Sequence, residues 1–278
     1  MSRRKKNELT FVVNLKRVIP RMTMFKVIAP MFFLGMILIE SNYCSQQSLP
    51  DVSSPESSSV PVASVTFRLG LSRFLDQRQF QELFPDAIDL YKFDGLVNAA
   101  KRYTEFANTS DDTNDRLELA AFLAQTAHES DNFKAAEEYA RDTYTVWQYC
   151  DNTTYPCAPG RSYYGRGPIQ LSWNYNYFLA GRDLGLDLLN VPELVATDDT
   201  ITWMTALWYW MTPQNGRVIH DVVTDVNGFS QSTAIINGGL ECGSNAPNTA
   251  NELQRIQYFM RFCEVLGVQP RGNTSCNA

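Results

Sequence analysis

The sequence predicts a mainly α-helical domain, and three segments of helical character carry that prediction. The first is an Ala- and Leu-rich run that ends at Glu129, the second is the Trp-rich run at residues 200–211, and the third covers residues 248–266. Ala and Leu favour helices, and apolar residues recur in these runs with helical spacing. Strand patterns are short and weak, so the expected class is α+β with one small β-hairpin near Glu138.

The first 64 residues are expected to precede the folded domain. In residues 1–44, a basic stretch leads into an apolar run at residues 27–39, which is short for a membrane span and suits a signal-peptide core. A signal anchor is the alternative, because the basic stretch is long and no Ala-x-Ala site follows. Residues 45–64 are rich in Ser and Pro, which predicts a flexible linker.

The folded domain is expected at residues 65–278, with its helices in order along the chain. Ser72 is the expected cap of the first helix, and a second helix is expected at residues 93–106. The third helix opens at residue 113 or 114 and continues to Glu129, where the sequence Ser130-Asp131-Asn132 indicates a stop. The apolar face of the first helix is expected to hold Phe74, Phe80, Leu83 and Phe84.

Charge is distributed unevenly along the 278 residues, whose net charge is −6. The first 26 residues hold eight basic residues and one acidic residue, so 16 basic and 29 acidic residues remain, a net charge of −13. An acidic domain repels phosphate, which argues against nucleic acid as a partner. Metal-ligand spacings and Gly-rich phosphate loops are missing from the sequence, so we expect neither a metal nor a cofactor.

Six cysteines suit a chain that reaches an oxidising compartment, either secreted or membrane-anchored. Cys150 and Cys157 bracket a short loop, which suits a local disulfide, and Cys242 and Cys276 are placed to tie down the C-terminal tail. The alternative is that all six are buried thiols. Glycosylation sequons, which are also typical of exported proteins, begin at Asn108, Asn152 and Asn273.

Residues 163–177, with the sequence YYGRGPIQLSWNYNY, have the composition of a sugar-binding surface. Five aromatic residues alternate there with small and amide residues. Aromatic faces stack on sugar rings, whereas Gln, Ser and Asn hydrogen-bond hydroxyl and acetamide groups. Arg166 in this run is expected to form a structural ion pair, and the distant His220 is expected to be an ordinary surface or loop residue.

Two carboxyl groups are needed to hydrolyse a glycosidic bond. One donates a proton to the leaving oxygen, and the other is a carboxylate that can activate the attacking water. Glu129 is the expected donor, because a Glu that ends an Ala-rich buried helix beside His128 is costly without a task. The alternative is that Glu129 faces water at its helix end. Glu137 and Glu138 compete for the second role: a continuing helix favours Glu137, and the stop after Glu129 favours Glu138.

Several motifs give the chain a resemblance to glycoside hydrolase family 19, the plant- and actinobacterial-type chitinases. They are the His128-Glu129 pair, CAPG at residues 157–160, the run at residues 163–177 and INGGLEC at residues 236–242. The similarity covers residues 72–276. It implies a bilobal, lysozyme-like helical domain with a central substrate cleft. It also implies a glycosidase that cleaves β-1,4-linked N-acetylglucosamine in chitin by an endo-acting, inverting reaction.

The resemblance also assigns roles to residues. Glu129 matches the general acid and Ser172 matches the residue that holds the attacking water, while the spacing in the compact actinobacterial form selects Glu138 as general base. The expected loop differs from the family pattern, because Ser130 replaces Thr and the usual glycine pair is missing. The substrate-binding set consists of His128, Tyr164, Gln170, Tyr175, Asn176, Asn237 and Arg255.

Two other functions remain open on the sequence. A peptidoglycan hydrolase would use the same residues, although an acidic surface suits an anionic cell wall poorly. A non-catalytic chitin-binding protein would need one carboxyl group to be displaced from the cleft. In each case the expected partner is a saccharide polymer, and the protein is expected to be a monomer.

Overall fold

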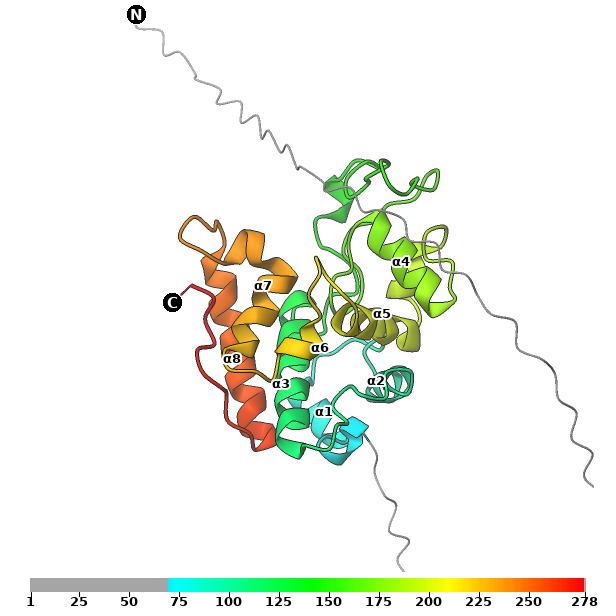
Figure 1. Ribbon diagram of the computed structural model, residues 1–278. Helices are drawn as coiled ribbons and strands as arrows, with labels where there is room; N and C mark the ends of the chain where they lie inside the picture. The colour runs from blue at the N-terminus through cyan, green and yellow to red at the C-terminus, as the bar shows by residue number, and fades with distance from the viewer. Residues whose placement is uncertain (1–69, 278) are drawn as a thin grey trace, which may run out of the picture. The chain divides into compact units, whose positions relative to one another are not determined.

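The computed structural model describes residues 70–277. The expected targeting segment and linker, together with Cys44, lie outside the described residues. The described part is mainly helical, which confirms the predicted fold class (Figure 1). With η marking 3-10 helices, the order is η1 (Gly70–Arg73), α1 (Gln77–Leu83), α2 (Phe93–Ala100), α3 (Asp112–Glu129), η2 (Arg141–Thr143), α4 (Asn174–Leu184), η3 (Pro192–Ala196), α5 (Asp199–Met211), α6 (Ile219–Val222), α7 (Gly228–Glu241) and α8 (Thr249–Leu266).

The expected hairpin near Glu138 is reduced to little more than one antiparallel bridge. Backbone hydrogen bonds on either side of this bridge run from Glu138 N–H to the Gly165 carbonyl (2.8 Å) and from Gly167 N–H to the Ala136 carbonyl (2.9 Å). Within residues 70–277, the isolated bridges are Glu137–Arg166, Arg166–Leu171 and Gln214–Arg217.

Two expected helix boundaries are wrong. Asp76 rather than Ser72 caps the first α-helix, because its side chain accepts from Gln79 N–H while the Gln79 side chain accepts from Asp76 N–H. This reciprocal pair satisfies two backbone donors at once. The second helix ends at Ala100 instead of Phe106, and the chain turns so that Ala107 N–H donates to the buried carboxylate of Glu118 (2.9 Å).

Helix α3 runs through the protein interior and delivers Glu129 at its C-terminal end. Asp111 caps its start by accepting from the N–H groups of Thr113 and Asn114, and every residue from 117 to 127 is buried. The expected stop is confirmed, because residues 131–133 adopt left-handed φ values of 50°, 59° and 63°. Ser130 Oγ stabilises the turn by donating to the Thr126 carbonyl (2.7 Å).

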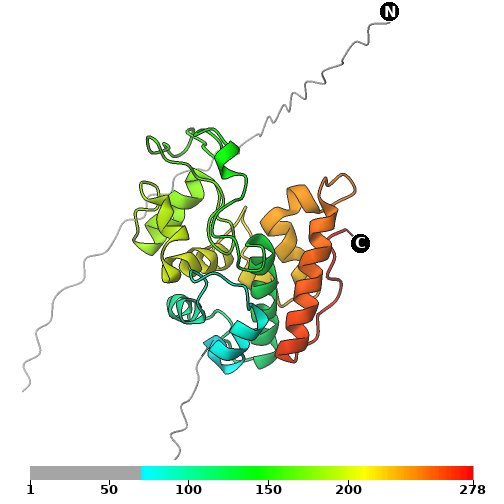
Figure 2. The same ribbon diagram turned by 180° about the vertical axis from the view of Figure 1, so that it is seen from behind.

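The described helices form two groups that meet along α3. Helix α3 packs along α8, and α7 contacts both, whereas α2 and α4 pack against α5. Figures 1 and 2 show α7 and α8 on one side of α3 and the α4–α5 pair on the other. Buried aromatic rings fill the core between these groups, among them Phe80, Phe122, Phe133, Trp203 and Trp210.

Both expected disulfides are confirmed. Cys150 bonds to Cys157, and Cys242 bonds to Cys276, which fastens the C-terminal tail to the end of α7. Cys263 is a buried free thiol on α8. Among residues 70–277, none of the helices combines the length and apolarity that a membrane span requires.

Candidate active site

A cavity of about 810 Å³ opens between the two groups of helices. Glu129 reaches it from the end of α3, and Glu138 reaches it from the loop that follows. Of the other expected site residues, Gln170, Ser172, Tyr175, Asn176 and Asn237 also line this cavity. Residues 138–179 and the helices α5 and α7 therefore surround the two carboxylates.

Three expected substrate-binding residues lie outside this lining: His128, Tyr164 and Arg255. Two of them, Tyr164 and Arg255, instead contact carboxylates. Tyr164 Oη donates to Glu137 (2.9 Å), and Arg255 donates to Glu129. His128 precedes Glu129 on α3, and its Nδ1 atom is buried without a hydrogen-bond partner in the described part of the chain.

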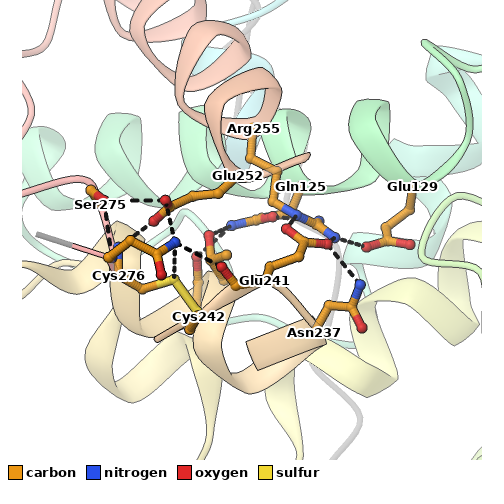
Figure 3. Close-up of polar contacts among 12 residues, drawn as sticks. Gln125, Glu129, Asn237, Glu241, Cys242, Glu252, Arg255, Ser275 and Cys276 are labelled. Atoms are coloured by element: carbon orange, nitrogen blue, oxygen red, sulfur yellow. Dashed lines mark hydrogen bonds and ion pairs between the residues drawn. A yellow bond between two sulfur atoms is a disulfide. The ribbon is translucent and has the colours of Figure 1, made fainter. Parts of the chain in front are cut away.

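Arg255 lies at the centre of a buried polar cluster (Figure 3). Its Nε and Nη2 atoms both donate to Glu241 at 2.8 Å, and Nη1 donates to the Gln125 side chain at 2.8 Å. Nη2 also donates to Glu129, so two carboxylates share one guanidinium. Asn237 completes the cluster with a 2.7 Å hydrogen bond from its amide to Glu241.

The electrostatics of this cluster differ from residue to residue. Burial alone would raise the pKa of Glu241, but the hydrogen bonds and charge of Arg255 outweigh burial, and the net result is a lowered pKa. Glu241 therefore stays ionised. Burial, reinforced by the charge of Arg255, lowers the pKa of His128, so this imidazole is neutral at neutral pH.

Glu138 is held by hydrogen-bond donors that carry no charge. The phenol groups of Tyr144 and Tyr149 both donate to its Oε1 atom, the latter at 3.1 Å. Gly165 N–H donates to Oε2 at 3.1 Å. Together these three donors address both oxygens of the carboxylate and fix its direction at the wall of the cavity.

Glu137 points away into a separate ion-pair network. Its carboxylate accepts from the Nε of the buried Arg166 (3.2 Å) and from Tyr164, and it pairs with Arg141 at 3.3 Å. The Arg166 guanidinium also stacks over the Tyr164 ring at 3.8 Å from the ring centre. The expected structural role of Arg166 is thus confirmed, and of the two competing carboxylates Glu138 is the one that lines the cavity.

The aromatic run at residues 163–177 divides between core and cavity. Tyr163 and Tyr177 are buried, while Trp173 lines the cavity with 39% of its surface exposed. Trp173 has a φ of 77°, an unfavourable value for a bulky residue, and its backbone is held by hydrogen bonds in both directions. Its ring stacks beside Tyr175, with centres 5.8 Å apart.

Sequence reasoning missed four residues of this site: Tyr144, Tyr149, Trp173 and Glu241. A signal was present for Glu241, because it follows Asn237 by four residues and therefore shares a helix face with it. Trp173 belongs to the aromatic run that already indicated sugar binding. Tyr144 and Tyr149 lie in irregular backbone, where spacing carries no information about direction.

The prediction for His220 is wrong. Instead of an ordinary surface residue it is a largely buried one, 18% exposed, whose Nδ1 lies 2.6 Å from Glu118. The Glu118 carboxylate also accepts from Trp210 Nε1 (2.9 Å). This pair joins α6 to α3 at some distance in sequence from Glu129, and it belongs to the core rather than the cavity lining.

Comparisons with known proteins agree on one family. The sequence model of the chitinase class I family, glycoside hydrolase 19, matches residues 71–276. An endochitinase of Pisum sativum is 41% identical over 210 residues, 67% of this chain and 65% of that protein, so the chain spans about two thirds of this relative. Endochitinase 1 of Theobroma cacao is 40% identical over 240 residues, covering 74% of each.

Solved structures give the same result. Chitinase C from Streptomyces griseus HUT6037 superposes with a TM-score of 0.67 at 39% identity, covering 73% of this chain and 80% of that one. A class IV chitinase from Zea mays superposes with a TM-score of 0.64 at 34% identity, covering 73% and 98%.

Proposed function

The chain belongs to glycoside hydrolase family 19, the class I chitinases, and from this premise we propose that it cleaves chitin within the polymer and inverts the anomeric carbon. The observation that carries the proposal is that Glu129 and Glu138 line one cavity from different segments of the chain. The relatives from pea and cacao are endochitinases. A pair of carboxyl groups around a sugar cleft is the equipment that glycoside hydrolysis requires.

In the proposed reaction Glu129 is the general acid and Glu138 the general base. Glu129 gives its proton to the glycosidic oxygen as the bond from that oxygen to the anomeric carbon breaks and its electron pair stays with the oxygen. Water attacks the anomeric carbon from the opposite face, and Glu138 accepts the proton that the water loses. Ser172, which lines the same cavity, is proposed to hold this water.

The buried cluster supports Glu129 from behind. Glu241 accepts three hydrogen bonds from Arg255 and Asn237, and these contacts lower its pKa, so it keeps its charge. Arg255 is therefore already paired with one carboxylate when it donates a further hydrogen bond to Glu129. We propose that this contact orients the carboxyl group of Glu129 at the cavity.

Sugar contacts are proposed for the rest of the lining. Trp173 and Tyr175 offer aromatic faces to pyranose rings, and Gln170, Asn176 and Asn237 offer amides to hydroxyl and acetamide groups. We further propose that the protein is secreted and acts as a monomer. Two disulfides in the described part suit an oxidising compartment.

Substitution of each carboxylate tests the proposal. Glu129→Gln and Glu138→Gln are each expected to lower kcat on a chitin hexamer by about 10²–10⁴, while chitin binding persists. Glu137→Gln is the matched control, because Glu137 contacts Arg166 rather than the cavity, and we expect it to lose much less activity. Near-normal turnover by Glu129→Gln would refute the assignment of the acid.

The products report the remaining features. Time-resolved NMR of hexamer hydrolysis is expected to show the α-anomer first, as inversion of a β-linkage requires, and internal cleavage products. A first product with β-configuration would overturn the inverting mechanism. Release of soluble products from purified bacterial cell wall, measured side by side with release from chitin, distinguishes a peptidoglycan hydrolase from a chitinase.

A further inference from the structure

Glu138 differs from the other carboxylates of the site in having no cationic partner. Glu129 and Glu241 both contact Arg255, and Glu137 contacts Arg141 and Arg166, all within residues 70–277. The ion pairs of that same region include none to Glu138. Its carboxylate is instead met by two phenols and one backbone N–H.

The two phenols approach Glu138 from a single loop that is firmly anchored. Tyr144 directly follows η2, and Tyr149 directly precedes the Cys150–Cys157 disulfide. The Tyr149 carbonyl accepts from Asn174 N–H at the start of α4 (3.0 Å). Their rings meet edge-on, with centres 5.7 Å apart and planes at 84°. The loop thus presents both hydroxyl groups to one oxygen atom.

A line of aromatic contacts continues from these phenols into the sugar-binding wall. The Tyr149 ring meets Trp173 edge-on at 5.5 Å, and Trp173 stacks beside Tyr175. Tyr149, Trp173 and Tyr175 all line the cavity. The hydroxyl of Tyr149 is nevertheless turned to Glu138, so its ring contributes to the wall while its polar group serves the carboxylate.

We infer that Tyr144 and Tyr149 are positioning residues that hold the Glu138 carboxylate at the cavity wall, and that removing their hydroxyl groups shifts the acidic limit of the pH range in which the enzyme works. The inference rests on the proposed role of Glu138 as base. Hydrogen bonds to a carboxylate favour its charged form, and charge-assisted bonds are stronger than neutral ones. The Arg141 guanidinium is close but donates to the backbone carbonyl of Glu138 (3.3 Å), so the hydrogen bonds to its carboxylate in the described part of the chain come from the two phenols and the Gly165 N–H.

Both phenols remain donors over the working range. Burial, followed by the charge and hydrogen bond of Glu138, raises the pKa of Tyr149, and the hydrogen bond to Glu138 is the main cause of the raised pKa of Tyr144. Both hydroxyl groups therefore keep their protons at acidic and neutral pH. The other titratable groups around Glu138 are engaged elsewhere or lie along the cavity: Glu129, Glu137, Tyr139, Arg141, Tyr164, Arg166, Tyr175 and Tyr209.

The test is the pH profile of Tyr144→Phe, Tyr149→Phe and the double variant. These changes keep the rings and remove only the hydroxyl groups. We expect the acidic limb of kcat/KM on a soluble chito-oligosaccharide to move to higher pH by about 0.5–1 unit for each hydroxyl. We expect KM to change less than twofold, because the hydroxyls contact the carboxylate rather than the cavity. Tyr139→Phe is the matched control, since its exposed phenol donates to Asp131.

A second readout does not depend on turnover. The ¹³C carboxyl resonance of Glu138, assigned by its loss in Glu138→Gln, is expected to titrate at higher pH in the double variant than in the parent. An unshifted limb and an unshifted resonance in a double variant with normal melting temperature would overturn the inference and leave the proposed function intact. An active Glu138→Gln would instead refute the proposed base, and the resonance would still decide whether the two hydroxyl groups act on Glu138.

Discussion

The guanidinium of Arg255 donates to the carboxylate of Glu129 from a position where only 1% of the arginine side chain is exposed. Glu241 takes two of the guanidinium hydrogen bonds and balances the positive charge. The proposed acid and the buried ion pair behind it therefore share one guanidinium.

Glu241→Gln is expected to impair catalysis without removing any group that faces the cavity. With Glu241 neutral, Glu129 is the one carboxylate left in contact with the Arg255 guanidinium, and the balance of charge behind the cavity is lost. We expect kcat at neutral pH to fall at least tenfold. Turnover of a soluble oligosaccharide measures the loss, and melting temperature controls for folding. Unchanged turnover in a folded variant would contradict the argument.

His220 is expected to make stability depend on pH near neutrality. Its hydrogen bond to Glu118, opposed by burial and supported by the Glu118 charge, raises the pKa of His220 in the folded protein. A folded pKa above the unfolded one gives stabilisation that is complete below about pH 6.5 and is lost as pH rises through the folded value. The melting temperature should therefore fall between pH 6 and pH 8.5. About 1 kcal/mol corresponds to about 2–4 °C in a domain of this size.

His220→Asn is the matched variant for that measurement. An Asn amide can reach Glu118 from the place of Nδ1 but does not titrate in this range. We expect the fall in melting temperature between pH 6 and pH 8.5 to disappear in this variant. The nearby Asp221 and Glu105, which also act on His220, are unchanged and serve as the internal background. A variant that keeps the full fall would place the pH dependence elsewhere.

The sequence was sufficient for those features that depend on local pattern. The run that ends at Glu129 is helical because its Ala and Leu residues are buried together, and the stop at Ser130 follows from polar residues that tolerate left-handed backbone. The boundary at Ser72 failed because Asp76 competes with it and has a Gln three residues later to complete a capping box. Several residues in a short segment can be of a type that caps a helix, and packing determines which of them does so.

The polar cluster around Arg255 and the hydrogen bonds that hold Glu138 could not be predicted from the sequence and were found only in the structure. Arg255 contacts Glu241 and Glu129 across 14 and 126 residues of sequence, and no periodicity reports such pairings. His220 and Glu118 are separated by 102 residues for the same reason. Glu137 and Glu138 were indistinguishable by type, and only the backbone bridge to Arg166 determines which carboxylate faces the cavity.

The two disulfides are expected to contribute unequally to stability. Cys242–Cys276 closes a separation of 34 residues and Cys150–Cys157 one of 7. Chain-entropy arguments give about 4 kcal/mol for the longer loop and about 2 kcal/mol for the shorter. Paired Cys→Ser variants unfolded in urea, with the parent as reference, measure the difference. Equal losses, or a larger loss at Cys150–Cys157, would show that strain or tail contacts outweigh loop length.

Gly165→Ala is expected to disturb the site by steric means alone. A Cβ atom at this position would lie 2.7 Å from Gln170 Oε1 and 3.1 Å from Gln170 Cβ, so the glutamine has to move. The same residue also donates its N–H to Glu138 and accepts from Glu138 N–H, which couples the shift to the proposed base. We expect at least a tenfold loss of kcat/KM, since small misplacements of catalytic groups are costly.

Gly239→Ala is the control for this substitution. It lies on α7, and a Cβ added there meets nothing within 4 Å. Alanine in a helix is favoured over glycine by about 1 kcal/mol, so this variant should keep its activity and unfold at a slightly higher temperature. The comparison separates contact with Gln170 from the general effect of adding a methyl group. If Gly165→Ala were as active as Gly239→Ala, the close approach of Gly165 to Gln170 would not matter for activity. The backbone at Glu138 would then have to adjust more easily than its hydrogen bonds indicate.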